Sequence, residues 1–480
     1  MNTAASPTVP SDLRAIFEAQ QAHRLRMAQT GAAERQAILR RLRGAIHRHR
    51  VRLAEALAAD LGKSRAEAEI TELHSVVGEL NHAVAHLPRW MRPRRVATPA
   101  TLLGSRSRVV PEARGVTLIL SPWNYPVNLS LAPLIASLAA GNTVMLKPSE
   151  KAPATAQALR TMLAEVFEPR LVAVIGGGAD VAQALTGLPF DHIFFTGSGE
   201  IGRRVMEAAA RNLTPVTLEL GGKSPALVGR SADLGLAAER IGWGKFLNAG
   251  QTCVAPDYVL VPEGQHDEFV ERLRAVVTRR YGPHPGTLTD FGRMVDAASV
   301  DRLQRLTDAS VRAGARVVFG GQFDAGQRFI SPTLVTGVTP EMPLMREELF
   351  GPVLPILPYR DLPDALALVR RLDTPLALYV FTRDPAQAEE VRRETRSGAL
   401  VVNGTVVHLT NPNLPFGGTG PSGMGSYHGE YGFRAFSHER AVLQEAALSP
   451  THLSFPPYGR PAPRFTAWLL RQMERTLPSG

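Results

Sequence analysis

The spacing of hydrophobic residues divides the chain into two regions of different character. Over about the first 90 residues, apolar side chains recur every three or four positions, and one such stripe comprises Ile70, Leu73, Val77, Leu80, Val84 and Leu87. This spacing places apolar residues on one face of a helix, so it predicts amphipathic helices. We expect Pro88 and Pro93 to end the helical region, because proline disrupts a helix interior.

From about Arg106 onward, short apolar runs alternate with helical stretches. The first series of expected strands covers residues 115–120, 143–146, 171–175 and 192–195. A second series begins after residues 221–222 and covers 226–228, 258–261, 316–319, 354–356, 377–381 and 400–403. Repeated strand–loop–helix units indicate parallel sheets covered by helices. The pattern therefore predicts two α/β domains.

The composition is that of an ordinary globular protein. A length of 480 residues suggests two or three domains, and 44% hydrophobic with 20% charged residues is typical of a folded soluble chain. The start of the chain lacks the basic and apolar pattern of a secretory signal, and the longest nearly apolar stretch, 129–140, is too short to span a bilayer. We expect a cytoplasmic protein without a membrane anchor.

The formal charge of +10 raises the question of nucleic-acid binding. The most basic stretch, 40–52, has the pattern of an amphipathic helix without interleaved aromatic residues, which favours a solvated face, so no nucleic-acid partner is expected. Only five of the 54 basic residues are lysines. Lys147, Lys223 and Lys245 lie in motif-like segments, which indicates positions where the wider arginine would not serve. The sequence offers no metal site.

The single cysteine, Cys253, excludes an intramolecular disulfide and a multi-cysteine metal cluster. Three interpretations remain: a buried structural thiol, a reactive nucleophile, or a residue without a role. A free cysteine is usually buried and inert. Its neighbours Gly250, Gln251, Thr252 and Pro256 instead indicate a tight segment that presents a side chain.

A glycine pattern indicates a dinucleotide site. Gly197, Gly199 and Gly202 fit G-x-G-x-x-G, follow an apolar run and precede an expected helix at 203–211. Glycine lets backbone amides approach a pyrophosphate at a helix N-terminus, although a plain strand-to-helix turn has the same pattern. Glu219 would be the ribose ligand of a simple Rossmann fingerprint. Glu219, however, lies between the two series of strand–loop–helix units. This position favours the alternative that Glu219 is a general base that faces a nucleophile on the other domain.

Several segments together resemble the aldehyde dehydrogenase superfamily, in that family's order and over nearly the whole chain. They are residues 122–126, 147–150, 215–225, 250–253, 347–352 and 415–418. Residues 253–258, 422–429 and 436–438 are similar to the class 3 branch, which includes fatty-aldehyde and coniferyl-aldehyde dehydrogenases. The resemblance implies an α/β fold with a Rossmann-type cofactor domain, an α/β catalytic domain and a small bridging β-strand element.

The resemblance also implies domain boundaries and an assembly. The NAD(P)-binding domain would comprise residues 1–95, with the N-terminal helices, and 114–221. The catalytic domain would be 222–415, the bridging strands 96–113 and 428–450, and the tail 451–480. A homodimer is expected, bridged by strands at about 106–114 and after Phe433.

The resemblance assigns three catalytic roles. Cys253 would attack the aldehyde carbonyl, Asn124 would donate its amide to the developing oxyanion beside the Cys253 backbone N–H, and Glu219 would activate the water that hydrolyses the thioester. The reaction would oxidise a medium or long aliphatic, or an aromatic, aldehyde to the acid. Without the resemblance, Asn124 in its proline-bounded loop would be read as a turn former.

The implied cofactor is NAD or NADP. Lys147 and Glu150 would lie near the adenine-side ribose, and Glu348 and Phe350 at the nicotinamide ribose and ring. Gly197, Ser198 and Gly202 would hold the pyrophosphate, and Trp123 would also contact the cofactor. Solvated turns for Lys147 and Glu150, and a core contact for Phe350, are the alternatives. The sequence departs from many relatives at Gly199, where they have threonine.

Two other functions remain open at this point. A non-catalytic protein of the same fold would have no use for Cys253, Glu219 and Asn124 together. A CoA-acylating dehydrogenase would transfer the acyl group to CoA and usually lacks a base at the position of Glu219. The sequence therefore favours hydrolysis to the free acid.

Overall fold

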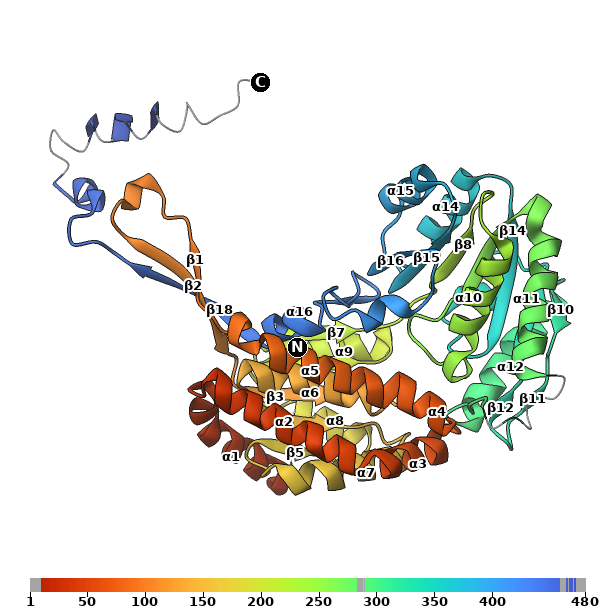
Figure 1. Cartoon of the computed structure of the whole chain (residues 1–480), viewed down its shortest axis with the longest axis horizontal. Helices are drawn as coiled ribbons and strands as arrows, with labels where there is room; N and C mark the ends of the chain where they lie inside the picture. Colours follow the sequence, from red (N-terminus) through yellow and green to blue (C-terminus); the bar gives the residue numbers. More distant parts are fainter. Residues whose placement is uncertain are drawn as a thin grey trace, which may run out of the picture.

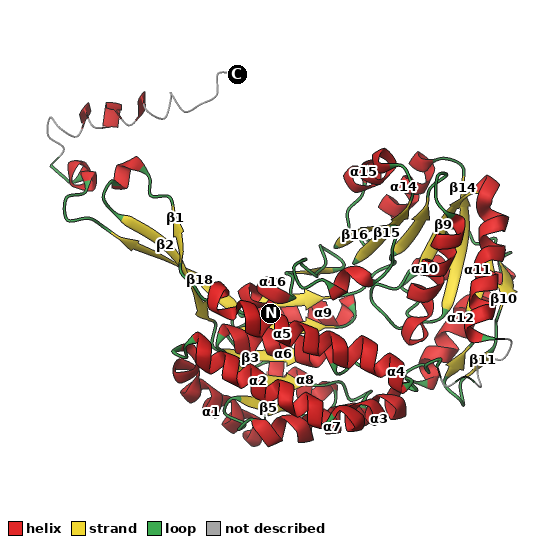
Figure 2. Ribbon diagram, in the orientation of Figure 1, coloured by secondary structure: helices red, strands yellow, loops and turns green. Residues whose placement is uncertain are grey.

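The computed structural model describes residues 10–282, 288, 290–457 and, in the tail, 463–464, 466–468 and 470–471. Most of the expected tail at 451–480 therefore lies outside the described residues. Two large sheets with helices on their faces form the body, and a slender three-stranded arm extends from it (Figures 1 and 2).

The N-terminal region is helical, and its helices pack against the first sheet and the helices of that sheet (Figure 1). The helices are α1 (Ser11–Ala28), α2 (Ala32–Arg48), α3 (Arg50–Leu61), α4 (Arg65–Ala68), the π-helical segment η1 (Glu69–His74) and α5 (Ser75–Trp90). Their apolar faces are buried, with Leu39, Leu42, Leu53 and Leu57 fully covered. This burial is the physical basis of the three-to-four-residue periodicity.

The expectation that Pro88 ends a helix is wrong, because α5 continues through it to Trp90. Proline has no N–H to donate to the carbonyl four residues earlier, which here is Val84 O. Gln36 Nε2 donates to Val84 O at 2.7 Å instead. A side chain of α2 therefore satisfies the carbonyl that Pro88 leaves free.

The first large sheet has six strands in the order β17-β7-β6-β3-β4-β5. Their bounds are β3 (Val116–Leu120), β4 (Thr143–Lys147), β5 (Val172–Val174), β6 (His192–Thr196), β7 (Val216–Glu219) and β17 (Gly423–Met424). The helices are α6 (Asn128–Ala140), α7 (Pro153–Val166), α8 (Ala179–Thr186) and α9 (Gly199–Ala210). All pairs are parallel except β17 with β7. The strands β7 and β17 were not expected, and α9 begins four residues before the expected helix.

The second large sheet has seven strands in the order β10-β13-β14-β9-β8-β15-β16. Their bounds are β8 (Pro225–Val228), β9 (Tyr258–Pro262), β10 (Arg316–Phe319), β13 (Thr333–Thr336), β14 (Val353–Tyr359), β15 (Ala377–Phe381) and β16 (Ala399–Val402). Only β10 runs antiparallel to its neighbour, and β13 was not expected.

Helices and short elements complete this part of the chain. They are α10 (Leu234–Phe246), η3 (Leu247–Gly250), η4 (Glu263–Gln265), α11 (His266–Tyr281), α12 (Ala297–Arg312), β11 (Phe323–Asp324), β12 (Phe329–Ile330), α13 (Pro343–Arg346), α14 (Leu362–Arg371), α15 (Pro385–Glu394) and η6 (Val407–Thr410). Among the described helices, none is both long and apolar enough to cross a membrane.

The arm is an antiparallel sheet of β1 (Arg94–Val96), β2 (Arg106–Ala113) and β18 (Ser437–Gln444). Strands β2 and β18 pair over their whole length, from Ser437 opposite Ala113 to Gln444 opposite Arg106. The short helix α16 (Gly429–Ala435) leads into β18, while η2 (Ala100–Leu102) and η7 (Pro450–Ser454) lie at the far end. Residues from opposite ends of the chain therefore form one projecting element (Figure 1).

Candidate active site

The expected site residues up to Glu219 lie at the carboxyl edge of the first sheet. Register pairs Leu120 of β3 with both Lys147 of β4 and Phe195 of β6, and Thr196 of β6 with Glu219 of β7. The loops that follow these four strands therefore begin side by side. This edge of a parallel sheet is where α/β folds bind ligands.

Cys253 follows a tight turn that the sequence only partly indicated. After α10, the segment η3 includes Asn248 and Ala249, both with φ of 52°. Gly250 continues the turn at φ +75°, and a Cβ there would lie 2.3 Å from the carbonyl oxygen of Gly351. Only glycine fits this contact, so the turn is held directly against the chain that follows Phe350.

Asn124 is joined to the Cys253 turn by hydrogen bonds. The loop between β3 and α6 carries Asn124, whose Nδ2 donates to Gln251 O at 3.0 Å. The next residue, Tyr125, has its hydroxyl 2.7 Å from Thr252 Oγ1. The amide is 3% exposed. These contacts bring the expected oxyanion donor to the residues just before the thiol, and the second N–H of the amide is available for another acceptor.

Glu219 is a buried carboxyl group at the end of β7. It is 1% exposed, and neither of its side-chain oxygens has a hydrogen-bond partner. Burial raises the pKa of Glu219 well above its usual value, because the charged form loses its hydration. Burial therefore favours the protonated form of this carboxyl group.

The thiol of Cys253 is free and partly exposed. Burial raises its pKa first, and the carboxyl groups of Glu348 and Glu219 raise it further, while the backbone N–H groups of Cys253 and Val254 act in the opposite direction. The effect of both carboxyl groups places Glu219 and Glu348 in the electrostatic surroundings of the thiol. The raised pKa of Cys253 favours the neutral thiol in the resting site.

The segment that carries Glu348 and Phe350 contacts Trp123 and residues 221–222. Trp123 and Phe350 meet edge to face, with ring centroids 5.4 Å apart. The Glu348 carboxyl lies against residues 221–222, since a Cβ at Gly221 would be 2.2 Å from Glu348 Oε2. Burial, followed by the nearby Asp257 charge, raises the pKa of Glu348 to about 8.

The remaining expected residues lie further along the sheet edge. Lys147 Nζ, which is buried, donates to Glu150 Oε2 at 2.9 Å. Ser198 caps α9 by accepting from Ile201 N at 3.4 Å. Gly197 and Gly202 pack tightly, because a Cβ would lie 2.5 Å from the Phe195 ring and 2.7 Å from a Leu220 methyl group, respectively.

These features suit a dinucleotide. At Gly199, an added Cβ would meet no atom nearer than 3.9 Å, so the backbone at the start of α9 is open to close approach. The N-terminus of a helix favours phosphate. Lys147 supplies an ammonium donor and Glu150 a carboxylate acceptor for hydroxyl groups. Within the described residues, no group of three or more His, Cys, Asp and Glu side chains is arranged to hold a metal ion.

Asp257 is a residue of the site that the sequence reasoning missed. Its Oδ2 accepts from Lys223 Nζ at 2.6 Å, and its Oδ1 accepts from Leu349 N at 3.1 Å. Lys245 Nζ lies 3.8 Å from Asp257 Oδ1, and burial lowers the Lys245 pKa to about 8. Asp257 therefore ties the chain after Cys253 to the chain that carries Glu348. The sequence signal that could have identified Asp257 was the rarity of lysine, because two of the five lysines, Lys223 and Lys245, lie against this carboxylate.

Comparison with known proteins places these features in a family. The sequence model of the Aldehyde dehydrogenase family matches residues 8–442. The chain is 42% identical over 420 residues to the 4,4'-diaponeurosporen-aldehyde dehydrogenase of Staphylococcus aureus, covering 88% of this chain and 91% of that protein. It is also 42% identical over 452 residues to the probable coniferyl aldehyde dehydrogenase of Pseudomonas aeruginosa, covering 94% of each.

Two further similarities concern assembly and fold. The dimeric NADP-preferring aldehyde dehydrogenase of Rattus norvegicus is 41% identical over 397 residues, covering 83% of this chain and 86% of that protein. The solved structure described as the substrate-bound state of Staphylococcus aureus AldH matches with a TM-score of 0.91 at 39% identity. That match covers 95% of this chain and 99% of the solved one, which confirms the expected fold class.

Proposed function

Because the chain belongs to the aldehyde dehydrogenase family, we propose that Cys253, Asn124 and Glu219 are its catalytic residues. The protein is an NAD(P)-dependent oxidoreductase that converts an aldehyde to the carboxylic acid. One observation carries the residue assignment: Asn124 Nδ2 bonds to Gln251 O, two residues before a thiol whose pKa responds to Glu219.

The first step is addition of the Cys253 sulfur to the aldehyde carbon. The thiol releases its proton to water, the C–S bond forms, and the carbonyl electron pair moves to oxygen, giving the anion of a thiohemiacetal. The free N–H of the Asn124 amide and the Cys253 backbone N–H stabilise that oxygen, which is worth about 3 kcal/mol for one such donor. A nicotinamide held by Glu348, Phe350 and Trp123 would supply the acceptor for the hydride of the former aldehyde carbon, which would leave a thioester on Cys253.

The second half of the reaction releases the acid. Glu219 in its ionised form takes a proton from water, the water oxygen attacks the thioester carbon, and the C–S bond breaks. Because burial favours the protonated form of Glu219, the group acts as a base only after it has lost its proton. A carboxylate with a raised pKa is a stronger base at neutral pH than an exposed one, provided that this deprotonation occurs.

The experiment that tests these roles is Glu219→Gln with mass spectrometry after mixing with aldehyde and cofactor. We expect an acyl adduct on Cys253, since hydrolysis loses its base, and slow steady-state turnover. Cys253→Ala should form no adduct and show no turnover. An unmodified thiol at the wild-type rate in Glu219→Gln contradicts the proposal. Release of acyl-CoA from the trapped adduct only when CoA is added would instead identify a CoA-acylating enzyme.

We propose the following cofactor contacts. Lys147 and Glu150 hold the adenine-side ribose, Ser198 with Gly197 and Gly202 the pyrophosphate, and Glu348, Phe350 and Trp123 the nicotinamide end. The open backbone at Gly199 and the face-to-edge contact of Trp123 with Phe350 support this assignment. The part built on the first sheet, residues 1–95 and 114–221, is then the cofactor domain, and 222–415 is the catalytic domain.

The substrate and the assembly follow from the relatives. We propose a medium or long aliphatic, or an aromatic, aldehyde, since the relatives' names include 4,4'-diaponeurosporen-aldehyde and coniferyl aldehyde. We propose a homodimer bridged by the arm at 96–113 and 428–450, as one relative is named dimeric. A catalytic thiol that must stay reduced favours the cytoplasm.

A further inference from the structure

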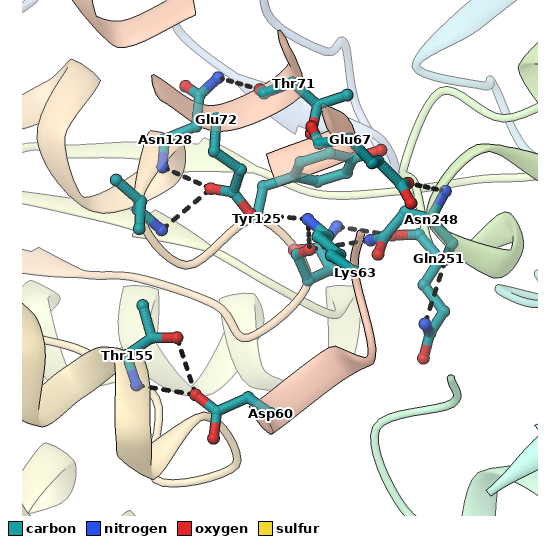
Figure 3. Close-up of polar contacts among 12 residues, drawn as sticks. Asp60, Lys63, Glu67, Thr71, Glu72, Tyr125, Asn128, Thr155, Asn248 and Gln251 are labelled. Carbon is teal, nitrogen blue, oxygen red and sulfur yellow. Dashed lines mark hydrogen bonds and ion pairs between the residues drawn. The ribbon is translucent and has the colours of Figure 1, made fainter. Parts of the chain in front are cut away.

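Lys63 and Glu72 form a buried ion pair at the boundary between the N-terminal helices and the catalytic loops (Figure 3). Both side chains are fully buried, and Lys63 Nζ lies 2.6 Å from Glu72 Oε1. A buried ion pair is weak evidence of a stability role, because desolvation of the two charges offsets their attraction. What the pair contacts is therefore more informative than its existence.

The pair forms hydrogen bonds with the backbone at both ends of the loop segment 124–128 (Figure 3). Lys63 Nζ donates to Asn124 O at 3.0 Å and lies 4.0 Å from the centroid of the Tyr125 ring. Glu72 Oε2 accepts from Val127 N at 3.0 Å and Asn128 N at 2.8 Å. The ammonium and the carboxylate thus fix the loop between Asn124 and the start of α6.

The same N-terminal segment also contacts the Cys253 turn. Glu67 Oε1 accepts from Asn248 N at 2.7 Å, and Asn248 Nδ2 donates to Asn124 O at 2.8 Å (Figure 3). Asn124 O therefore accepts two hydrogen bonds, one from Lys63 and one from Asn248. Glu72 lies in the π-helical segment η1, a type of local helix irregularity that occurs frequently at functional sites.

We infer that Lys63 and Glu72 are positioning residues for the Asn124 amide. This inference rests on the proposed role of Asn124 as the oxyanion donor. A donor of this kind works only when it is held at hydrogen-bond distance from the place where charge develops. Lys63 acts on the Asn124 backbone and Glu72 on the end of the loop, so neither touches the reacting atoms. Lysine suits the site because its compact ammonium reaches two acceptors and a ring at once.

The first test is Lys63→Met, with kcat expressed per titratable Cys253 thiol. We expect kcat to fall on the order of 100-fold, as for a misplaced catalytic group, with KM changed by less than about twofold. The matched control is Arg35→Met. Arg35 is also a buried cation, 5% exposed, and it donates to Ala139 O at 3.0 Å, at the opposite end of α6. Its loss should lower the melting temperature and leave kcat per thiol unchanged.

Because Lys63→Met leaves the Glu72 carboxylate buried without a cation, the double variant Lys63→Met/Glu72→Gln is needed. It removes both charges and keeps an acceptor for the Val127 and Asn128 amides. We expect the melting temperature to recover while kcat stays low. Recovery of both together would mean that the pair only stabilises the fold, and it would overturn the inference. An equal fall of kcat in Arg35→Met would do the same.

A double-mutant cycle separates this inference from the function on which it rests. If Lys63 acts through Asn124, adding Lys63→Met to Asn124→Ala should lower kcat by less than about twofold more. Losses that multiply would overturn the positioning role alone. Wild-type kcat in Asn124→Ala itself would instead remove Asn124 from the mechanism, and the positioning role with it.

Discussion

Glu348 makes the stability of the protein depend on pH. Its pKa is raised to about 8 by burial, from an ordinary value of 4.5. Between these values the folded state holds a proton that the unfolded state has lost, so the free energy of unfolding falls as pH rises through this window. Below pH 4.5 the group is protonated in both states and contributes no slope.

We therefore expect the free energy of unfolding of Glu348→Gln to decrease less steeply with pH than that of the wild type between about pH 5 and 8. The reason is that an amide releases no proton. Urea unfolding at several pH values measures this. Glu271→Gln, which removes an exposed carboxyl group on α11, is the control and should keep the wild-type slope. A slope in Glu348→Gln as steep as in the wild type would contradict the raised pKa.

The individual site residues illustrate what a sequence does and does not reveal. The neighbours of Cys253 indicated a presenting turn, because such signals are local in the chain. The glycine pattern likewise indicated a helix after β6, although its start was placed four residues too late. Lys63, Glu72 and Asp257 were missed, although lysine is rare here. Their roles depend on hydrogen bonds to residues far away in sequence, such as that from Lys63 Nζ to Asn124 O, and no local pattern encodes those contacts.

The turn η3 holds the segment that carries the thiol against residues 351–352, which follow Phe350. An alanine Cβ at Gly250 would lie 2.3 Å from the Gly351 oxygen and 2.9 Å from Pro352 N, and neither backbone atom can rotate away. At φ +75° a side chain is also strained. We expect Gly250→Ala to lower the free energy of unfolding by about 3 kcal/mol and to reduce kcat.

The control for this change is Gly314→Ala. Gly314 also has a positive φ, of +111°, but an added Cβ there meets nothing within 4 Å. It should carry only the backbone strain of about 1–2 kcal/mol, with kcat unchanged. Urea unfolding and steady-state kinetics on both variants separate the two effects. Equal behaviour of Gly250→Ala and Gly314→Ala would show that the contact with Gly351 is unimportant.

Most elements were predictable where their pattern is simple. The strands of the two sheets that are buried at every residue, such as β3 and β15, match the expected ranges within one residue. Strands β7 and β13 were missed because glycine and proline flank short runs that resemble loops. The helix α5 continues past Pro88 because Gln36, from another helix, donates a hydrogen bond to the carbonyl of Val84. Tertiary contacts of that kind override local rules.

At the scale of the whole chain, two strand edges carry exposed apolar side chains. Strand β16 is at the edge of the seven-stranded sheet, and its Val402 is 49% exposed. Strand β18 is at the edge of the projecting arm, and its Leu443 is 50% exposed. Within the described residues, the outer edge of each pairs with no other strand. Such edges are suited to association with a second chain.

The proposed homodimer therefore predicts a particle of twice the 51.9 kDa of one chain by analytical ultracentrifugation. We expect Leu443→Glu or Val402→Glu to shift the mass toward a single chain, because each would bury an unpaired charge in the interface. Leu25→Glu is the control, since Leu25 is 68% exposed on α1, away from both edges, and it should leave the dimer intact. A wild-type particle with the mass of one chain, 51.9 kDa, at micromolar concentration would contradict the dimer. Dimers that persist in both edge variants would instead place the interface elsewhere, since a charge at a true edge contact weakens association by mass action.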